Sequence, residues 1–429
     1  MIFGRSTRTH ASAQPASPAP GQTGGPGGLG ALQDVGNLAR YGFEYLPADQ
    51  VYMDSACQTL RPQPVIDAMN EYFLTYNACG ERVQYEWGKK IDERVETTRA
   101  SVLKALGKSP KKFTAAFTLN TTYGLNLLLT QVPAGRFARV ITTHTEHNSV
   151  FLSTMACAAR AGVERILLDR NPADGSLILD GVNLTDALVV VSAMNNVTGA
   201  TTPNLADLID ATHKAGGIVI IDAAQAMPHA PALVKALDAD AICFSAHKTY
   251  GASLGVVVAR NDLLASLDLN FIGGGQVTSV TADSYELLPE LHTRLEAGLQ
   301  PWGEIIALDA ALTWLDGFAR GAGEALEVRE HRLSTILHAG LTETGKLDVL
   351  SQPGSSLVTV EPRTVDGHRL ATFLSKAGIM VRSGYFCAHH WLIDLGGYSP
   401  LVRFSLGAHT TDDDIARTLD VTSRLMKGL

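Results

Sequence analysis

Seven short apolar runs, separated by stretches of helical pattern, constrain the fold of this chain more than any other feature. They are FTAAFTL (113–119), ARVITT (138–143), RILLD (165–169), ALVVVSA (187–193), GIVIIDA (217–223), AICFSA (241–246) and LGVVVA (254–259). Several are apolar throughout instead of alternating, which is typical of strands covered on both faces. The strand–helix–strand order predicts an α/β protein with a mostly parallel sheet between helices. In such sheets ligands bind beyond the carboxyl ends of the strands.

A second, smaller α/β unit is predicted near the C-terminus. A helical pattern from Pro301 to about Thr342 would connect it to the first unit. Three strand candidates follow, SLVTVE (356–361), IMVRS (379–383) and LVRFSL (401–406). Thr410 or Thr411, directly before an acidic run, would cap a last helix, because hydroxyls accept free N–H groups and carboxylates favour the N-terminal end of the helix dipole.

These patterns divide the chain into four parts. Residues 1–33 are predicted to form a disordered tail, because they are rich in Ala, Pro and Gly. Residues 34–55 would pack against the small domain. Residues 56–300 would form the large domain, and residues 301–429 the connecting helix and the small C-terminal domain.

Composition excludes several classes of function. The chain has 429 residues, of which 45% are hydrophobic and 18% charged, as expected for a soluble globular enzyme. Its net charge of −8 argues against binding nucleic acid. No apolar run approaches the roughly 20 residues of a membrane span. The five cysteines include no C-x-x-C pair, which favours reduced thiols in a cytoplasmic protein without a metal site.

The stretch FSAHKTYG (244–251) places Lys248 directly after a predicted buried strand. One interpretation is a turn lysine whose amine extends to water. The other is an amine held in a dry pocket as the nucleophile for a carbonyl cofactor. The residues at the ends of the neighbouring strands bear on this choice.

A pyridoxal phosphate (PLP) site needs a lysine, an acid for the pyridine nitrogen and a planar group against the ring. Asp222 ends the run GIVIID and is followed by Gln225, while His147 follows ARVITT. Each has an ordinary alternative, since a strand-end aspartate often caps a helix and a lone histidine is usually structural.

Hydroxyl groups suited to a phosphate occur at two further strand ends. Thr121 and Thr122 precede an apolar helix, whose free N–H groups would add to a phosphate cradle, although an ordinary threonine cap has the same pattern. Ser245 and His247 flank Lys248 and can also reach a phosphate.

Eight motifs follow one another in the order found in the class V aminotransferase fold. They are DSA (54–56), TEHNS (145–149), NNVTG (195–199), IDAAQ (221–225), FSAHK (244–248), GGG (273–275), EAG (296–298) and RSGYFC (382–387). The chain resembles the PLP enzymes of this fold, and among them the group II cysteine desulfurases and selenocysteine lyases most. This resemblance implies the PLP-dependent transferase fold type I and favours Lys248 as the cofactor lysine.

The resemblance also implies a role for each candidate residue. Lys248 would bind PLP covalently and later move the proton at the substrate α-carbon. Asp222 would pair with the pyridine nitrogen and Gln225 would face the phenolic oxygen. His147 would stack on the ring and, as a catalytic residue, assist proton transfer. The phosphate would be held by Thr121, Thr122, Ser245 and His247. The substrate carboxylate would be bound by Asn196, Arg382 and Arg403, where a guanidinium gives a bidentate grip.

Cys387 decides the predicted reaction. It lies where the group II desulfurases carry a nucleophilic cysteine, whose thiolate takes the sulfur of the substrate and leaves alanine and an enzyme persulfide. Arg382, His389 and His390 would help to keep the thiol deprotonated. A buried inert cysteine is the alternative, and Cys57 in DSACQT is a rival thiol.

Three segments depart from the family pattern. Leu299 and Gln300 follow EAG, where the family has a threonine that reaches the phosphate of the neighbouring subunit. CGERVQYEWGKK (79–90) replaces a histidine-rich segment, and Tyr385 and Phe386 precede Cys387 where histidines are frequent. Selenocysteine lyase, another C–S lyase, aminotransferase, epimerase and a non-catalytic PLP-binding protein therefore stay open.

The predicted function is a PLP-dependent cysteine desulfurase that converts L-cysteine to L-alanine. The resemblance further implies a homodimer and a sulfur-acceptor protein as partner.

Overall fold

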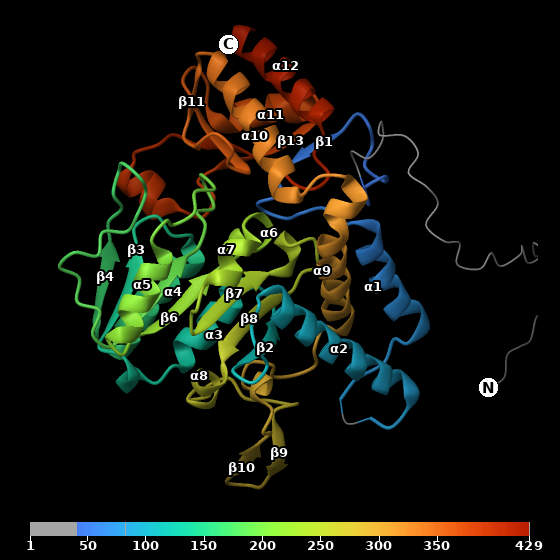
Figure 1. Cartoon of the computed structure of the whole chain (residues 1–429), viewed down its shortest axis with the longest axis vertical. Helices are drawn as coiled ribbons and strands as arrows, with labels where there is room; N and C mark the ends of the chain where they lie inside the picture. The colour runs from blue at the N-terminus through green and yellow to red at the C-terminus, as the bar shows by residue number, and fades with distance from the viewer. Residues whose placement is uncertain (1–40, 82, 429) are drawn as a thin grey trace, which may run out of the picture. The chain divides into compact units, whose positions relative to one another are not determined.

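The structure, a computed structural model, describes residues 41–81 and 83–428, so the predicted tail at 1–33 lies outside the described residues. A seven-stranded sheet with the order β2-β8-β7-β6-β5-β3-β4 forms the centre of the larger part (Figure 1). Its strands are β2 (Phe113–Thr118), β3 (Arg139–Thr143), β4 (Glu164–Leu168), β5 (Ala187–Ser192), β6 (Ile218–Asp222), β7 (Ala241–Ser245) and β8 (Gly255–Arg260). All seven predicted runs are strands of this sheet. β8 pairs antiparallel with β2 and β7, and every other pair in the sheet is parallel, which confirms the mostly parallel α/β fold.

The central strands are apolar throughout because both of their faces are covered. Val189 and Val191 of β5 pack into one hydrophobic core, whereas Leu188 and Val190 pack into another. Successive side chains of a strand point to opposite faces. One face is covered by α3 (Thr121–Gln131) and α4 (Asn148–Ala161), and the other by α2 (Glu86–Ala105), α5 (Leu205–Lys214) and α9 (Trp302–Ala322).

A five-stranded sheet lies in the C-terminal part, with the order β1-β13-β14-β12-β11. Its strands are β1 (Val51–Met53), β11 (Leu347–Val349), β12 (Leu357–Pro362), β13 (Ile379–Gly384) and β14 (Leu401–Ser405). The helices α10 (Leu326–Glu343), α11 (Gly367–Lys376) and α12 (Asp412–Gly428) pack with it. β1 comes from the N-terminal side of the chain and pairs in parallel with β13, Val51 opposite Ile379 (Figure 1).

Two helix ends refine the predicted boundaries. The helical pattern after Pro301 forms two helices, because Gly323 adopts a left-handed backbone (φ 71°) that ends α9. At the last helix, the N–H of Asp414 donates to Oγ1 of Thr411 (3.1 Å) and the N–H of Thr411 donates to the carboxylate of Asp414 (3.0 Å). Thr411 is therefore the capping residue. Thr410 instead accepts the N–H of Gly407.

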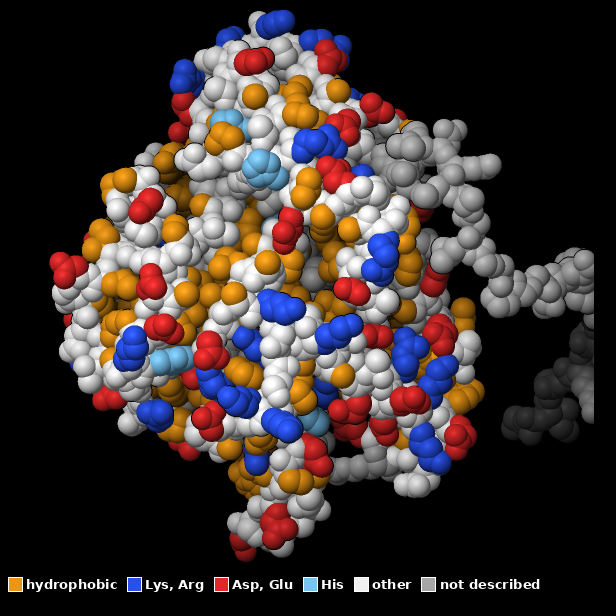
Figure 2. All heavy atoms as spheres, in the orientation of Figure 1, with side chains coloured by type: hydrophobic (Ala, Val, Ile, Leu, Met, Phe, Trp, Pro, Cys, Tyr) orange, Lys and Arg blue, Asp and Glu red, His pale blue; other side chains and the backbone are white. Residues whose placement is uncertain are grey.

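The described surface carries charges of both signs. In Figure 2 the Lys and Arg side chains lie among Asp and Glu side chains over the face seen, with acidic side chains at the tip of the hairpin formed by β9 (Val277–Val280) and β10 (Tyr285–Leu287). Within 41–81 and 83–428, no helix has the length and apolar character needed to span a membrane. The same residues include no group of His, Cys, Asp and Glu able to hold a metal ion.

Candidate active site

A cavity of about 320 Å³ opens at the carboxyl ends of the parallel strands, and residues from both sheets line it. It is lined by every residue proposed from the sequence to bind the cofactor or the substrate or to act in catalysis: Thr121, Thr122, His147, Asn196, Asp222, Gln225, Ser245, His247, Lys248, Arg382, Cys387 and Arg403. Residues that lie far apart in the sequence thus meet in one cavity.

Lys248 ends a short 3-10 turn (Ala246–Lys248) that directly follows β7. Its amine lines the cavity, and none of the described residues hydrogen-bonds it. Burial lowers the pKa of the Lys248 amine, while the Asp222 carboxylate acts in the opposite direction. A partly dehydrated amine with a lowered pKa is suited to nucleophilic attack on a carbonyl. The surface-turn interpretation of Lys248 does not fit this position.

Asp222 is the last residue of β6 and is buried. One carboxylate oxygen accepts the N–H of Ala224 (2.9 Å), and the other accepts the hydroxyl of Ser149 (3.3 Å). Burial raises the pKa of the Asp222 carboxyl, and these hydrogen bonds oppose the rise. The next helix, α6 (Ala226–His229), has Gln225 at its N-cap, so Asp222 does not cap it.

His147 combines an ordinary structural role with a place in the cavity. It is the N-cap of α4, where Nδ1 accepts the N–H of Ser149 (3.0 Å) and lies 2.8 Å from the Ser149 hydroxyl. The ring proton of the neutral side chain is therefore on Nε2. Burial, aided by the charge of Lys248, lowers the pKa of His147 to about 3, so the ring is neutral at physiological pH.

The candidate phosphate residues form a small cluster of hydroxyl groups. The hydroxyls of Thr121 and Ser245 lie 2.6 Å apart, and the N–H of Thr121 donates to Ser245 (3.0 Å). Thr121 and Thr122 begin α3, which Asn120 caps through the N–H of Tyr123. Hydroxyls beside a helix N-terminus suit an anion.

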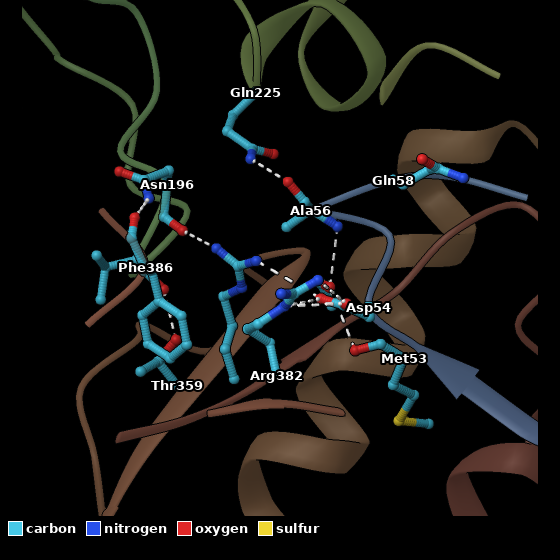
Figure 3. Close-up of polar contacts among 12 residues, drawn as sticks. Met53, Asp54, Ala56, Gln58, Asn196, Gln225, Thr359, Arg382 and Phe386 are labelled. Carbon is cyan, nitrogen blue, oxygen red and sulfur yellow. Dashed lines mark hydrogen bonds and ion pairs between the residues drawn. The ribbon is translucent and has the colours of Figure 1, made fainter. Parts of the chain in front are cut away.

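Gln225 and His247 lie on the same side of the sheet edge. Gln225 donates its side-chain amide to the carbonyl of Ala56 (2.7 Å), whereas its buried Oε1 has no partner among residues 41–81 and 83–428 (Figure 3). Burial lowers the pKa of His247 to about 4, so this ring is also neutral. An amide with a free acceptor inside a cavity indicates room for a further polar group.

Arg403 and Arg382 share one counter-ion, Asp54, which begins the DSA motif but was not predicted as a site residue. Arg382 Nη2 lies 2.6 Å and Arg403 Nη2 3.7 Å from Asp54 oxygens (Figure 3). Arg403 also donates to the backbone carbonyl of Asn196 (2.6 Å), and its buried Nε has no partner in the part of the chain that the structure describes. Burial lowers the pKa of Arg403 to about 10, which leaves it charged. One carboxylate between two guanidinium groups leaves a net positive charge, and this favours binding of a carboxylate.

Cys387 lies on a backbone held in an unusual conformation. Phe386 and Cys387 have φ values of 48° and 57°, in the left-handed region that non-glycine residues rarely adopt. The carbonyl of Cys387 accepts the N–H of Asn148 (2.6 Å), and the side chain of Asn196 donates to the carbonyl of Phe386 (2.7 Å). Cys387 itself is exposed. The inert buried cysteine expected as an alternative is therefore excluded.

The two histidines after Cys387 do not line the cavity. His389 hydrogen-bonds the side chain of Asn148 (3.0 Å), and His390 lies between His144 (3.1 Å) and Asp394 (3.0 Å). They attach the Cys387 segment to the loop that carries His147. This contact was not predicted, because no sequence pattern relates the two segments.

The fold and this cavity together define a class of enzyme. The chain belongs to the class V aminotransferase family, whose model, "Aminotransferase class-V", matches residues 51–418. This confirms the resemblance proposed from the motifs, and the residues present fit PLP: a free amine, a buried carboxylate and a hydroxyl cluster face one cavity, where the Gln225 oxygen has no partner.

The relatives that carry a specific name are cysteine desulfurases. The chain is 30% identical to a probable cysteine desulfurase of Vibrio cholerae, covering 86% of this chain and 92% of that protein. It is 28% identical to a cysteine desulfurase of Escherichia coli, covering 92% and 96%. Among solved structures, it is similar to the apo form of a cysteine desulfurase from Thermococcus onnurineus, with a TM-score of 0.81, 28% identity, and coverage of 89% and 96%. This structural neighbour confirms fold type I.

Proposed function

We propose that this chain is a PLP-dependent cysteine desulfurase, which converts L-cysteine to L-alanine and retains the sulfur as a persulfide on Cys387. One observation carries the proposal: the amine of Lys248 and the thiol of Cys387 line the same cavity, together with the charged guanidinium of Arg403. An amine nucleophile, a carboxylate grip and a second, sulfur nucleophile are the groups that this reaction needs.

The residues that would hold PLP are those that the family resemblance implies, and their place in one cavity supports this assignment. Lys248 would hold it covalently, Asp222 at the pyridine nitrogen and Gln225 at the phenolic oxygen, with the neutral ring of His147 against its face. Thr121, Thr122, Ser245 and His247 would hold its phosphate. When bound, PLP supplies an electron sink that stabilises negative charge at the substrate α-carbon.

The other residues act directly on the amino acid. Arg403, supported by Asn196 and Arg382, would bind its carboxylate. The amine of Lys248 would move the proton at the α-carbon. The thiolate of Cys387 would attack the substrate sulfur, so that the C–S bond breaks, an S–S bond forms on Cys387 and the carbon skeleton leaves as L-alanine.

The thiol in the cavity separates this function from its alternatives. An aminotransferase or an epimerase needs the cofactor, the lysine and the carboxylate grip, but it has no use for Cys387. A selenocysteine lyase would share the rest of the site but would not need the thiol of Cys387, because selenium can leave without nucleophilic help. A non-catalytic PLP-binding protein would have no need for the exposed Cys387 at the mouth of the cavity.

The direct test is to incubate the purified protein with L-cysteine and to measure alanine, sulfide and protein-bound persulfide. We expect the wild type to form alanine and a persulfide on Cys387, and Cys387→Ala to form neither while it keeps the visible absorbance of bound PLP. Cys79→Ala is the matched control, because Cys79 is exposed but does not line the cavity. If the wild type forms no alanine from L-cysteine, the desulfurase proposal is wrong. Undiminished turnover of L-selenocysteine by Cys387→Ala, without turnover of cysteine by the wild type, would instead indicate a selenocysteine lyase.

A homodimer is part of the same proposal. Phe73 and Leu299 are exposed by 49% and 77% and line one groove, which supports contact with a second subunit. Gln300 is buried and donates to the carbonyl of Gly298 of its own chain, so we do not assign it the phosphate contact across subunits. We expect Leu299→Lys to shift the mass measured by light scattering from dimer to monomer, whereas Val280→Lys, at the equally exposed hairpin, leaves the dimer intact. A wild type that is fully active as a monomer would contradict this part of the proposal.

Three further parts of the proposal concern the cellular location, the sulfur acceptor and the division into domains. The free state of all five cysteines supports a cytoplasmic location. The exposure of Cys387 supports transfer of its sulfur to an acceptor protein. We retain the division into a large domain at 56–300 and, at 301–429, a connecting helix with a small C-terminal domain, against which the segment 34–55 would pack. In the described part of that segment, β1 pairs with β13.

A further inference from the structure

The cavity holds a second thiol, which the reaction proposed above does not use. Cys57 lines the same cavity as Cys387. The other three cysteines lie elsewhere, since Cys157 and Cys243 are buried in the hydrophobic core and Cys79 is outside the cavity. Two of the five sulfur atoms thus open into one space of about 320 Å³.

The two thiols reach this space from segments that are held independently. Cys57 lies in the turn after β1, where its N–H donates to the carbonyl of Asp54 (3.0 Å). Two residues later, the N–H of Thr59 donates to the carbonyl of His247 (2.9 Å), which fixes this segment to the large domain. Cys387 lies after β13 and is tied to the N-terminus of α4. Neither thiol depends on the other for its position.

The charges of the cavity act on both sulfur atoms. The Lys248 amine and the Arg403 guanidinium each interact electrostatically with both Cys57 and Cys387. Arg403 is 4% exposed, and its Nε has no partner among the described residues. A persulfide with a deprotonated outer sulfur is an anion. The amine of Lys248 and the guanidinium of Arg403 therefore stabilise it on Cys57 as well as on Cys387.

The two positions differ in their access to solvent. Cys387 is exposed, whereas Cys57 is only partly accessible. A sulfane sulfur on Cys387 can be attacked by thiols from solution, and one on Cys57 is more sheltered. Moving the sulfur inward also returns Cys387 to its thiolate form, ready for a second substrate.

We propose that Cys57 is a second sulfur carrier that receives the sulfur from Cys387. The inference rests on the desulfurase function proposed above. The thiolate of Cys57 attacks the outer sulfur of the Cys387 persulfide, a new S–S bond forms at Cys57, and the S–S bond at Cys387 breaks with Cys387 leaving as the thiolate. The persulfide moves from Cys387 to Cys57, and the thiolate is then on Cys387 instead of Cys57, so no oxidant or reductant is needed. Each chain can then hold two sulfane sulfur atoms.

The test counts sulfur atoms per chain. The holoenzyme is mixed rapidly with a small excess of L-cysteine over two molecules per chain and without any other thiol. The reaction is quenched with an alkylating reagent during the first burst, before free cysteine removes the persulfides, and the protein is digested and mapped by mass spectrometry. We expect two alanines and two sulfane sulfurs per wild-type chain, first on the peptide of Cys387 and later also on that of Cys57. Both counts should fall twofold in Cys57→Ser and in Cys57→Ala, and to zero in Cys387→Ser. Cys79→Ser is the matched control and should keep both counts at the wild-type value.

The outcomes distinguish this inference from the function on which it rests. One sulfur per wild-type chain, all of it on Cys387, overturns the carrier role of Cys57 and leaves the desulfurase intact. A sulfur on Cys57 in the Cys387→Ser variant overturns the order of transfer. A disulfide between Cys57 and Cys387 with release of sulfide also overturns the relay. Absence of alanine in the wild type removes the desulfurase function itself.

Discussion

Asp54 holds Arg382 through an ion pair in which Nη2 and Nε of the guanidinium lie 2.6 and 3.1 Å from the same carboxylate oxygen. The pair joins the segment after β1 to β13, and the other oxygen of Asp54 lies 3.7 Å from the buried Arg403. Asp54 is therefore the counter-ion of both arginines proposed to bind the substrate carboxylate. Its negative charge partly neutralises the two guanidinium groups, and so sets the net positive charge that is available to the substrate carboxylate.

We expect Asp54→Asn to lower the free energy of unfolding by about 1–3 kcal/mol, because the change leaves a buried guanidinium without its counter-ion. Urea denaturation measures this effect. Asp394→Asn is the matched control, since the side chain of Asp394 is 73% exposed and pairs only with a histidine. Equal stability of both variants would show that Asp54 does not stabilise Arg403.

Lys248 should be the lysine that binds PLP. We expect borohydride reduction of the purified protein to attach the pyridoxyl group to the peptide that contains FSAHK, and Lys248→Ala to lack both the covalent label and the activity. Lys235, which lies on α7 (Pro231–Ala236) outside the cavity, provides the control variant. A label on any other lysine would refute the assignment.

Ser149 should tune the carboxylate of Asp222, because its hydroxyl lies 3.3 Å from that carboxylate and 2.8 Å from Nδ1 of His147. Its hydrogen bond lowers the pKa of Asp222, so Ser149→Ala should raise that pKa and shift the pH titration of the absorbance of bound PLP. We expect a loss of about 1 kcal/mol in PLP binding, or roughly fivefold in affinity. Ser153→Ala on the same helix removes a hydroxyl that bonds only to backbone carbonyls. A similar shift in Ser153→Ala would mean that the effect does not come from Asp222.

Acid should destabilise the PLP-free protein through His147 and His247. Their folded pKa values of about 3 and about 4 lie below the ordinary value of 6.5, because burial disfavours the charged ring. Below pH 6.5 the unfolded chain binds protons that the folded chain does not, so stability is complete above pH 6.5 and falls as the pH drops toward about 4. The slope is at most about 1.4 kcal/mol per pH unit for each histidine.

Urea denaturation between pH 7 and pH 5 measures this slope. We expect His147→Gln and His247→Gln each to reduce it, whereas His331→Gln, at an exposed position on α10, leaves it unchanged. Parallel pH profiles for all four proteins would contradict the assignment to the two cavity histidines.

The strands were predictable because their signal is local. A run such as GIVIID is apolar at every position, and this pattern depends only on burial of both faces of the strand. The residues at the strand ends could be predicted as site residues for the same reason, since the carboxyl ends of parallel strands meet at one edge of a sheet. The roles of Arg403 and Cys387 came only from the resemblance to the family, because nothing in their local sequence distinguishes them.

β1 and the break in the long helical pattern could not be predicted, because the local sequence carries no pattern that indicates them. VYM is a strand of three residues, too short for a periodic pattern, and it is a strand because β13 pairs with it. The end of α9 at Gly323 depends on a left-handed backbone that many glycines do not adopt.

The sequence by itself determined the seven strands of the large sheet and the residues that end them. Only the tertiary structure decided that Asp54 neutralises Arg382, that Ser149 lies between His147 and Asp222, and that Cys57 faces the same cavity as Cys387. The reason is physical: hydrophobic periodicity is repeated over many residues and follows from each segment alone, whereas a hydrogen bond or an ion pair between distant residues depends on the final position of both partners.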